Sequence, residues 1–80
     1  MTLHAARIEH SPRLQRVMAL LNDGQWHGTR AIVHAAEVMA VNSAISELRA
    51  NRVDVECRCV GRGLYEYRLR PAQLELLEAA

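Results

Sequence analysis

The polar side chains best suited to recognise another molecule lie between positions 42 and 49 of this 80-residue chain. Asn42, Ser46 and Arg49 are spaced i, i+4 and i+7, so they share one side of a helix, and Ser43 and Glu47 flank them. DNA offers partners for such groups: Asn suits adenine, Arg suits guanine or phosphate, and Ser suits either a base or phosphate. The alternative is that these residues only form the solvent-exposed face that every amphipathic helix has. Glu47 weighs against DNA contact unless its carboxylate accepts from cytosine or orients an Arg.

A second group of candidate residues is the set of arginines on a predicted β-hairpin. Arginine on the outward face or tip of a hairpin can enter a narrow minor groove or pair with phosphate. These positions are Arg58, Arg62, Arg68 and Arg70. The alternative is that they form cross-strand ion pairs with three acids on the same face, Asp54, Glu56 and Glu66. Arg62, at the tip and away from those acids, is the strongest candidate of this group.

The two cysteines and four histidines predict no metal site. Cys57 and Cys59 share a strand face with Val53 and Val55, so we expect buried thiols that act as small hydrophobes. Two cysteines supply too few zinc ligands, and the histidines, at positions 4, 10, 27 and 34, have no recognisable metal-binding spacing. The sequence has no catalytic triad spacing, paired carboxylates or Gly-rich phosphate loop. We therefore expect neither catalysis nor a cofactor.

The clearest element that could position these residues is a helix starting at Ser11-Pro12. Serine caps a free backbone N–H there, and proline fits the first helical position. Apolar residues follow at i, i+3, i+4 and i+7, namely Leu14, Val17, Met18 and Leu21. The run Asn22-Asp23-Gly24 predicts the end of this helix.

Two further helices are predicted over residues 30–37 and 41–50, joined by Val38-Met39-Ala40. A short extended stretch at residues 25–28 precedes the first of them, and Thr29 is its candidate N-cap. The expected inward residues are Ile32, Val33 and Ala36 in the first helix, and Val41, Ala44, Ile45 and Leu48 in the second. Asn51 is expected to take the left-handed conformation that ends the second helix.

The hydrophobic period changes to two after position 52, which predicts a hairpin. Apolar and charged residues alternate over residues 53–59 and again over residues 65–70, with Gly61-Arg62-Gly63 as the turn. Pro71 ends the second strand, and residues 71–78 are expected to form a short helix with an apolar edge. One side of the hairpin is therefore apolar and the other is charged.

This order of elements predicts an α+β fold of the winged helix-turn-helix type: a three-helix core, a two-stranded wing and a short C-terminal helix. The stretch from Leu14 to Leu69 also resembles the short winged helix-turn-helix proteins of bacteriophages and prophages. The matching segments are Trp26-His27-Gly28-Thr29, residues 42–49, Val53-Asp54-Val55-Glu56 and residues 63–69. Similar proteins usually have Gly after the third helix, where this chain has Asn51-Arg52.

Length and charge limit the remaining possibilities. Eighty residues allow one small domain, for which we expect an N-terminal arm at 1–10, a domain at 11–70 and a short helix or tail at 71–80. No apolar run could span a bilayer and no signal peptide is evident, so we expect a cytoplasmic protein. Net charge is only +1, but residues 40–70 contain six Arg against four acids. That balance favours contact-specific binding over indiscriminate coating of DNA.

The leading hypothesis is a sequence-specific double-stranded DNA-binding regulator, of the phage or prophage kind that the resemblance implies. The predicted DNA-binding residues are Thr29, Arg30, Asn42, Ser43, Ser46, Arg49, Arg62 and Arg68. A homodimer would double the contacts, and its candidate surface is the segment with Leu74, Leu76 and Leu77, unless these residues pack on the first helix. The rival hypothesis is a winged-helix module that binds and inhibits a host protein complex, because fold does not decide function. A component of a replication or recombination assembly is a third possibility.

Overall fold

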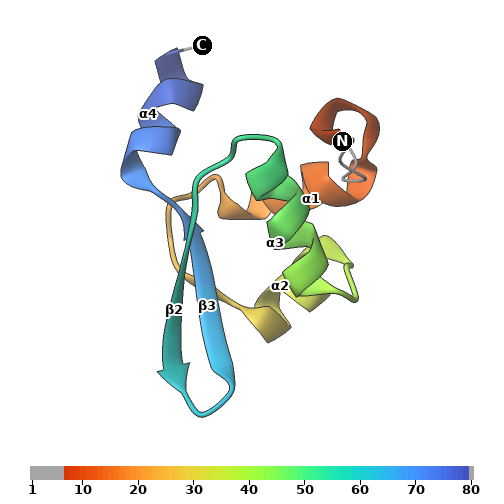
Figure 1. Cartoon of the computed structure of the whole chain (residues 1–80), viewed down its shortest axis with the longest axis vertical. Helices are drawn as coiled ribbons and strands as arrows, with labels where there is room; N and C mark the ends of the chain where they lie inside the picture. Colours follow the sequence, from red (N-terminus) through yellow and green to blue (C-terminus); the bar gives the residue numbers. More distant parts are fainter. Residues whose placement is uncertain (1–6, 80) are drawn as a thin grey trace.

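The computed structural model describes the backbone of residues 7–79 and the side chains of residues 7–75. Within this part, a short 3₁₀ turn, four α-helices and a three-stranded antiparallel sheet form an α+β fold (Figure 1). The elements are η1 (Ile8–His10), α1 (Pro12–Leu21), β1 (His27–Gly28), α2 (Thr29–Ala36), α3 (Val41–Ala50), β2 (Val55–Gly61), β3 (Leu64–Leu69) and α4 (Pro71–Ala79). None of the helices in the described part is long and apolar enough to cross a membrane.

Helix α1 begins and ends as the sequence predicts. The Ser11 hydroxyl accepts the N–H of Leu14 at 3.2 Å, and Pro12 occupies the first helical position. Leu14, Val17 and Leu21 are fully buried, whereas Met18 is half-buried at the edge of the core. The amphipathic prediction for this helix is confirmed.

Helix α2 starts differently from the prediction. Thr29 is the first residue of the helix rather than its N-cap, and Gly28 precedes it in an extended conformation. The Thr29 hydroxyl instead donates to the backbone oxygen of Tyr65 at 3.4 Å, because β1 pairs with β3 and brings that carbonyl within reach. Glu37, with φ 55°, ends the helix in the left-handed region. The prediction of Thr29 as N-cap is therefore wrong.

Helix α3 buries the face that its spacing predicts, and Asn51 caps its end as expected, but not in the expected conformation. Val41, Ala44, Ile45 and Leu48 all lie in the core. The left-handed residue after the helix is Arg52, with φ 65°, and Asn51 has φ −91°.

The side chain of Asn51 explains this difference. Its amide donates to the Glu47 backbone oxygen at 2.7 Å and accepts the Ile8 N–H at 3.3 Å. These bonds join the end of α3 to η1 and hold Asn51 at φ −91° and ψ 18°. The chain therefore turns into the left-handed region one residue later, at Arg52. The prediction that Asn51 caps this helix is confirmed, and the prediction that it does so in the left-handed conformation is wrong.

The sheet has the strand order β1-β3-β2, so the predicted hairpin gains a short third strand at residues 27–28. His27 lies opposite Tyr67 in the pairing of β1 with β3, and Val55 lies opposite Leu69 in the pairing of β2 with β3. A register shift between Cys59 and Gly61 leaves Val60 as an extra residue near the tip. The predicted hairpin and extended stretch are confirmed.

Only the base of the hairpin packs on the helices. Val55, Tyr67 and Leu69 are buried in the core, but Cys57 and Cys59 are exposed. The prediction of buried thiols is wrong, because the hairpin extends beyond the three-helix core (Figure 1) and nothing in the described part covers this length of its apolar face.

The two ends of the chain are partly built into the domain. Ile8 packs against the core and its N–H is bonded to Asn51 at the end of α3, so residues 8–10 of the predicted arm belong to the packed domain; residues 1–6 lie outside the described residues. Leu74 of α4 also packs against the core, and a Cβ built on Gly24 would lie 2.7 Å from its Cδ1 atom. The side chains of Leu76 and Leu77 lie outside the described residues.

Candidate functional site

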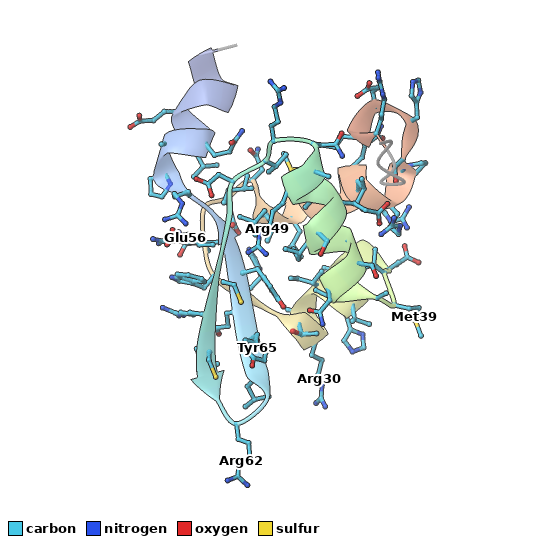
Figure 2. All side chains as sticks on the ribbon, in the orientation of Figure 1. Arg30, Met39, Arg49, Glu56, Arg62 and Tyr65 are labelled. Carbon is cyan, nitrogen blue, oxygen red and sulfur yellow. The ribbon has the colours of Figure 1, made fainter. Side chains whose placement is uncertain are left out.

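The exposed side of α3 faces a groove whose other wall is the inner face of the hairpin. Asn42, Ser43, Ser46 and Arg49 are all exposed, as their predicted stripe requires. The groove has a volume of about 400 Å³. Its lining residues are Asn42, Ile45, Ser46, Arg49, Cys57, Tyr65 and Tyr67. Figure 2 shows Arg49 and Tyr65 in the space between α3 and the hairpin.

Two side chains of the stripe are held by the hairpin. The Tyr67 hydroxyl donates to Asn42 Oδ1 at 3.1 Å. The guanidinium of Arg49 donates through Nη2 to the backbone oxygen of Val55 at 2.9 Å. The hairpin therefore orients Asn42 and Arg49, while the two serine hydroxyls remain exposed to solvent.

Tyr67 is the ring that joins the two walls of the groove. Only 5% of it is exposed. Burial is the main cause that raises the pKa of Tyr67 above its ordinary value of 10.0, and the neighbouring Cys57 raises it further. Its hydroxyl therefore stays protonated and donates to Asn42 at neutral pH.

The carboxylate of Glu47, which the sequence sets against DNA contact, is neutralised by another helix. Arg13 on α1 forms a salt bridge with it, and the Glu47 side chain is only 20% exposed. The acid therefore turns toward α1 and away from the groove. Its cost to an anionic partner is smaller than the sequence pattern alone implies.

The outward face of the sheet has a different character, because its arginines are paired with acids. The ion pairs there are Arg58–Glu66 at 2.7 Å, Arg68–Glu56 at 2.8 Å, Arg70–Asp54 at 2.8 Å and Arg70–Glu56 at 3.5 Å. The guanidinium carbons of Arg58 and Arg68 also lie 4.2 and 4.6 Å from the ring centre of Trp26. Figure 2 shows Glu56 on the side of the hairpin away from α3. The acids on this face therefore neutralise its arginines, which leaves little positive charge there for an anionic partner.

Two arginines of the predicted site are unpaired. Arg30, at the start of α2, and Arg62, in the hairpin turn, form neither an ion pair nor a side-chain hydrogen bond within the part of the chain that the structure describes. Figure 2 shows both side chains extending from the same end of the molecule, opposite to α4. Their charges are available to an anionic partner.

The eight predicted site residues therefore do not all lie on one surface of the structure. Asn42, Ser46 and Arg49 line the main groove, and Thr29 joins Asn42 in lining the hollow beside it. Ser43 is exposed on α3, and Arg30 and Arg62 extend beyond the groove at one end. Arg68 lies on the opposite face of the sheet, paired with an acid.

The groove also contains residues that sequence reasoning did not select. Tyr65 and Tyr67 alternate with charged residues, a pattern that indicated core only, yet both line the groove and Tyr65 is 45% exposed. A signal was present: the hairpin is too long for its whole apolar face to be covered by helices of eight to ten residues.

No known protein family, curated protein or solved structure matches this chain.

Proposed function

We propose that this protein is a winged helix-turn-helix DNA-binding protein in which α3 enters the major groove and the β2–β3 hairpin is the wing. The order α1-β1-α2-α3-β2-β3 supports this architecture. A helix about 10–12 Å across fits a major groove about 12 Å wide. The exposed amide, hydroxyl and guanidinium groups of α3 suit base edges and phosphates.

The observation that carries the proposal is the sorting of the arginines. Those on the outward sheet face are paired with acids, whereas Arg30 and Arg62 are unpaired and project at the end of the α3 groove. A folded domain gains little from leaving charges unpaired, but an anionic partner gains from them. Arg30 and Arg62 would neutralise phosphates on either side of the inserted helix, while Asn42, Ser46 and Arg49 face the bases.

The test compares two double variants that carry the same net charge. Arg30→Ala/Arg62→Ala removes the unpaired arginines, and Arg58→Ala/Arg70→Ala removes two paired ones as the control. Affinity for a fluorescein-labelled, mixed-sequence duplex of roughly 30 base pairs is measured by anisotropy from about 50 to 200 mM salt. Each lost phosphate contact should reduce the slope of log K against log salt by about 0.9, so the first variant should lose about 1.8 and the control almost nothing.

Equal effects of the two variants, or a wild-type salt slope near zero, would contradict the proposal. The part played by α3 is tested separately with Asn42→Ala/Ser46→Ala. This variant should retain most of the salt slope but lose discrimination among duplex sequences enriched by selection from a random pool, since base contacts specify and phosphate contacts position.

The resemblance to short phage and prophage proteins supports a role in transcription regulation. A homodimer would place two α3 helices on half-sites about one helical turn apart. Sedimentation with and without a duplex containing two selected half-sites tests this arrangement.

A second candidate function, binding to a protein partner, is favoured by exposed apolar side chains. Met39, Leu64 and Val60 are 91%, 61% and 50% exposed. If the wild type binds no duplex from a random pool, while a captured host protein is released by Leu64→Ser, this second function replaces the first.

A further inference from the structure

The tip of the hairpin has more exposed apolar surface than phosphate contact requires. Four large apolar side chains are exposed in the described part of the chain, and three of them, Val60, Leu64 and Tyr65, belong to the end of the hairpin. Scattered exposed apolar residues are ordinary, but three within six residues at one tip form a patch. Arg62 lies between them in the sequence.

The backbone presents this patch in a defined way. Val60 is the extra residue of the bulge between Cys59 and Gly61, and bulges re-aim side chains. Gly61 lies beneath the side chain of Leu64, because a Cβ built there would be 3.1 Å from Leu64 Cδ1. Gly63, with φ 69°, makes the turn. The two aliphatic side chains are therefore held at the tip by the strand geometry.

Two unpaired arginines lie beside the patch, and Glu66, which lines the same hollow, is neutralised by Arg58. A hollow of about 250 Å³ separates the tip from the start of α2, and Arg30, Val60 and Leu64 are among its lining residues. Arg62 extends beyond the turn (Figure 2). Aliphatic side chains flanked by unpaired guanidinium groups are complementary to a partner with anionic edges and an apolar interior, which is the chemistry of a base-pair step between two phosphate backbones.

We propose that the hairpin tip is an apolar wedge: Leu64, supported by Val60, inserts between adjacent base pairs from the minor groove and bends the duplex, with Arg62 and Arg30 on the flanking phosphates. This inference rests on the proposed function and names what the wing recognises, namely a step that unstacks easily. Unstacking costs a few kcal/mol per step and is offset by burial of the wedge and by added contact with the bent duplex.

A thermodynamic cycle tests the wedge without knowledge of the natural target. The probes are two duplexes of roughly 30 base pairs, one fully paired and one with a single central mismatch, each with a donor and an acceptor dye at its ends. A mismatch lowers the cost of unstacking, so the wild type should bind the mismatched duplex about tenfold more tightly, equivalent to 1.4 kcal/mol. Binding should also raise energy transfer as the ends approach.

Leu64→Ser is the test variant and Met39→Ser is its matched control. Both replace an exposed apolar side chain by serine, and Met39, at the α2–α3 connection (Figure 2), does not line the hollow that contains Val60 and Leu64. Leu64→Ser should bind both duplexes within about twofold of each other and lose most of the change in energy transfer, with its salt slope retained. Val60→Thr should show a smaller loss, and Met39→Ser should behave like the wild type.

Each outcome decides the proposal. Wild-type binding without bending or mismatch preference overturns the wedge but leaves the proposed DNA-binding function intact. Leu64→Ser with unchanged bending and preference also overturns the wedge. No binding of the wild type to either duplex, at any salt concentration tested, overturns the wedge and the DNA-binding function together.

Discussion

Replacement of Tyr67 by phenylalanine tests whether the hairpin and α3 are joined as the structure shows. Tyr67→Phe removes one hydroxyl and leaves the packing of a ring that is only 5% exposed. That hydroxyl donates to Asn42 Oδ1 at 3.1 Å and so joins α3 to β3. The substitution therefore removes this contact across the groove and keeps the ring, although Thr29 and Cys57 also lie beside the hydroxyl.

The expected magnitude follows from the burial of the two partners. Asn42 is an exposed residue, so water can replace the lost donor, and the cost should be the net value of one hydrogen bond, about 1 kcal/mol. For a domain of this size, that corresponds to a fall in Tm of about 4–8 °C. Asn42→Ala should cost a similar amount, because it leaves a mostly buried phenol without its acceptor.

The assay is a double-mutant cycle on the free energy of unfolding, measured in urea for the wild type, both single variants and the pair. If the hydrogen bond exists, the double variant should be less destabilised than the sum of the single ones by about 1 kcal/mol. A coupling energy below about 0.3 kcal/mol, the usual error of additivity, would refute this geometry of the groove.

The same residue predicts a pH dependence. The folded-state pKa of Tyr67 is raised, chiefly by burial, so the folded protein holds this proton more tightly than the unfolded chain does. The resulting stability is fully present below the ordinary value of 10.0 and is lost as pH rises through the folded pKa. Tyr67→Phe should therefore lose less stability than the wild type above about pH 10. Equal alkaline losses would contradict the burial of this hydroxyl.

Three further predictions concern the rest of the domain. Cys57 and Cys59 are exposed, so both thiols should react with a chromogenic disulfide in the folded protein at nearly the rate found in urea. A much slower reaction in the folded protein would show that the thiols are buried, as the sequence predicts. Ser11→Ala removes the cap of the first helix and should lower the unfolding free energy by about 1 kcal/mol, whereas Ser11→Thr, which keeps the hydroxyl, should lower it less. A hydrogen bond from the Gln25 N–H is the main cause that lowers the pKa of Asp23 in the folded protein. The unfolding free energy that this effect contributes is present above the ordinary pKa of 3.8 and is lost as pH falls through the lower folded-state pKa. In urea unfolding, Asp23→Asn should lose less unfolding free energy than the wild type as the pH is lowered. An equal loss in the two proteins would argue against this hydrogen bond.

Hydrophobic period and backbone chemistry, both local properties, account for what the sequence predicts about the elements. The spacing of Leu14, Val17 and Leu21 indicates a helix wherever it is placed, and Ser11-Pro12 marks its start. The change to period two after residue 52 likewise indicates a hairpin. Because these signals depend on neighbouring residues only, they are confirmed in the structure.

The errors occur where distant segments meet. The Thr29 hydroxyl donates to a carbonyl of β3 and does not cap α2, and Asn51, bonded to η1, caps α3 without the predicted left-handed conformation. Cys57 and Cys59 satisfy a strand pattern, but the pattern does not say how far the helices extend along the hairpin. Each error reflects a contact or a missing contact across the fold.

The candidate site shows the same division. The stripe of Asn42, Ser46 and Arg49 follows from sequence spacing and helical geometry alone, and so does the position of Arg62 at a turn. Only the tertiary structure decides which arginines are paired with acids, since pairing depends on strand register and on which face of the sheet each side chain occupies. Spacing along the chain determines which side chains share a face, whereas packing in three dimensions determines which charges are left for a partner.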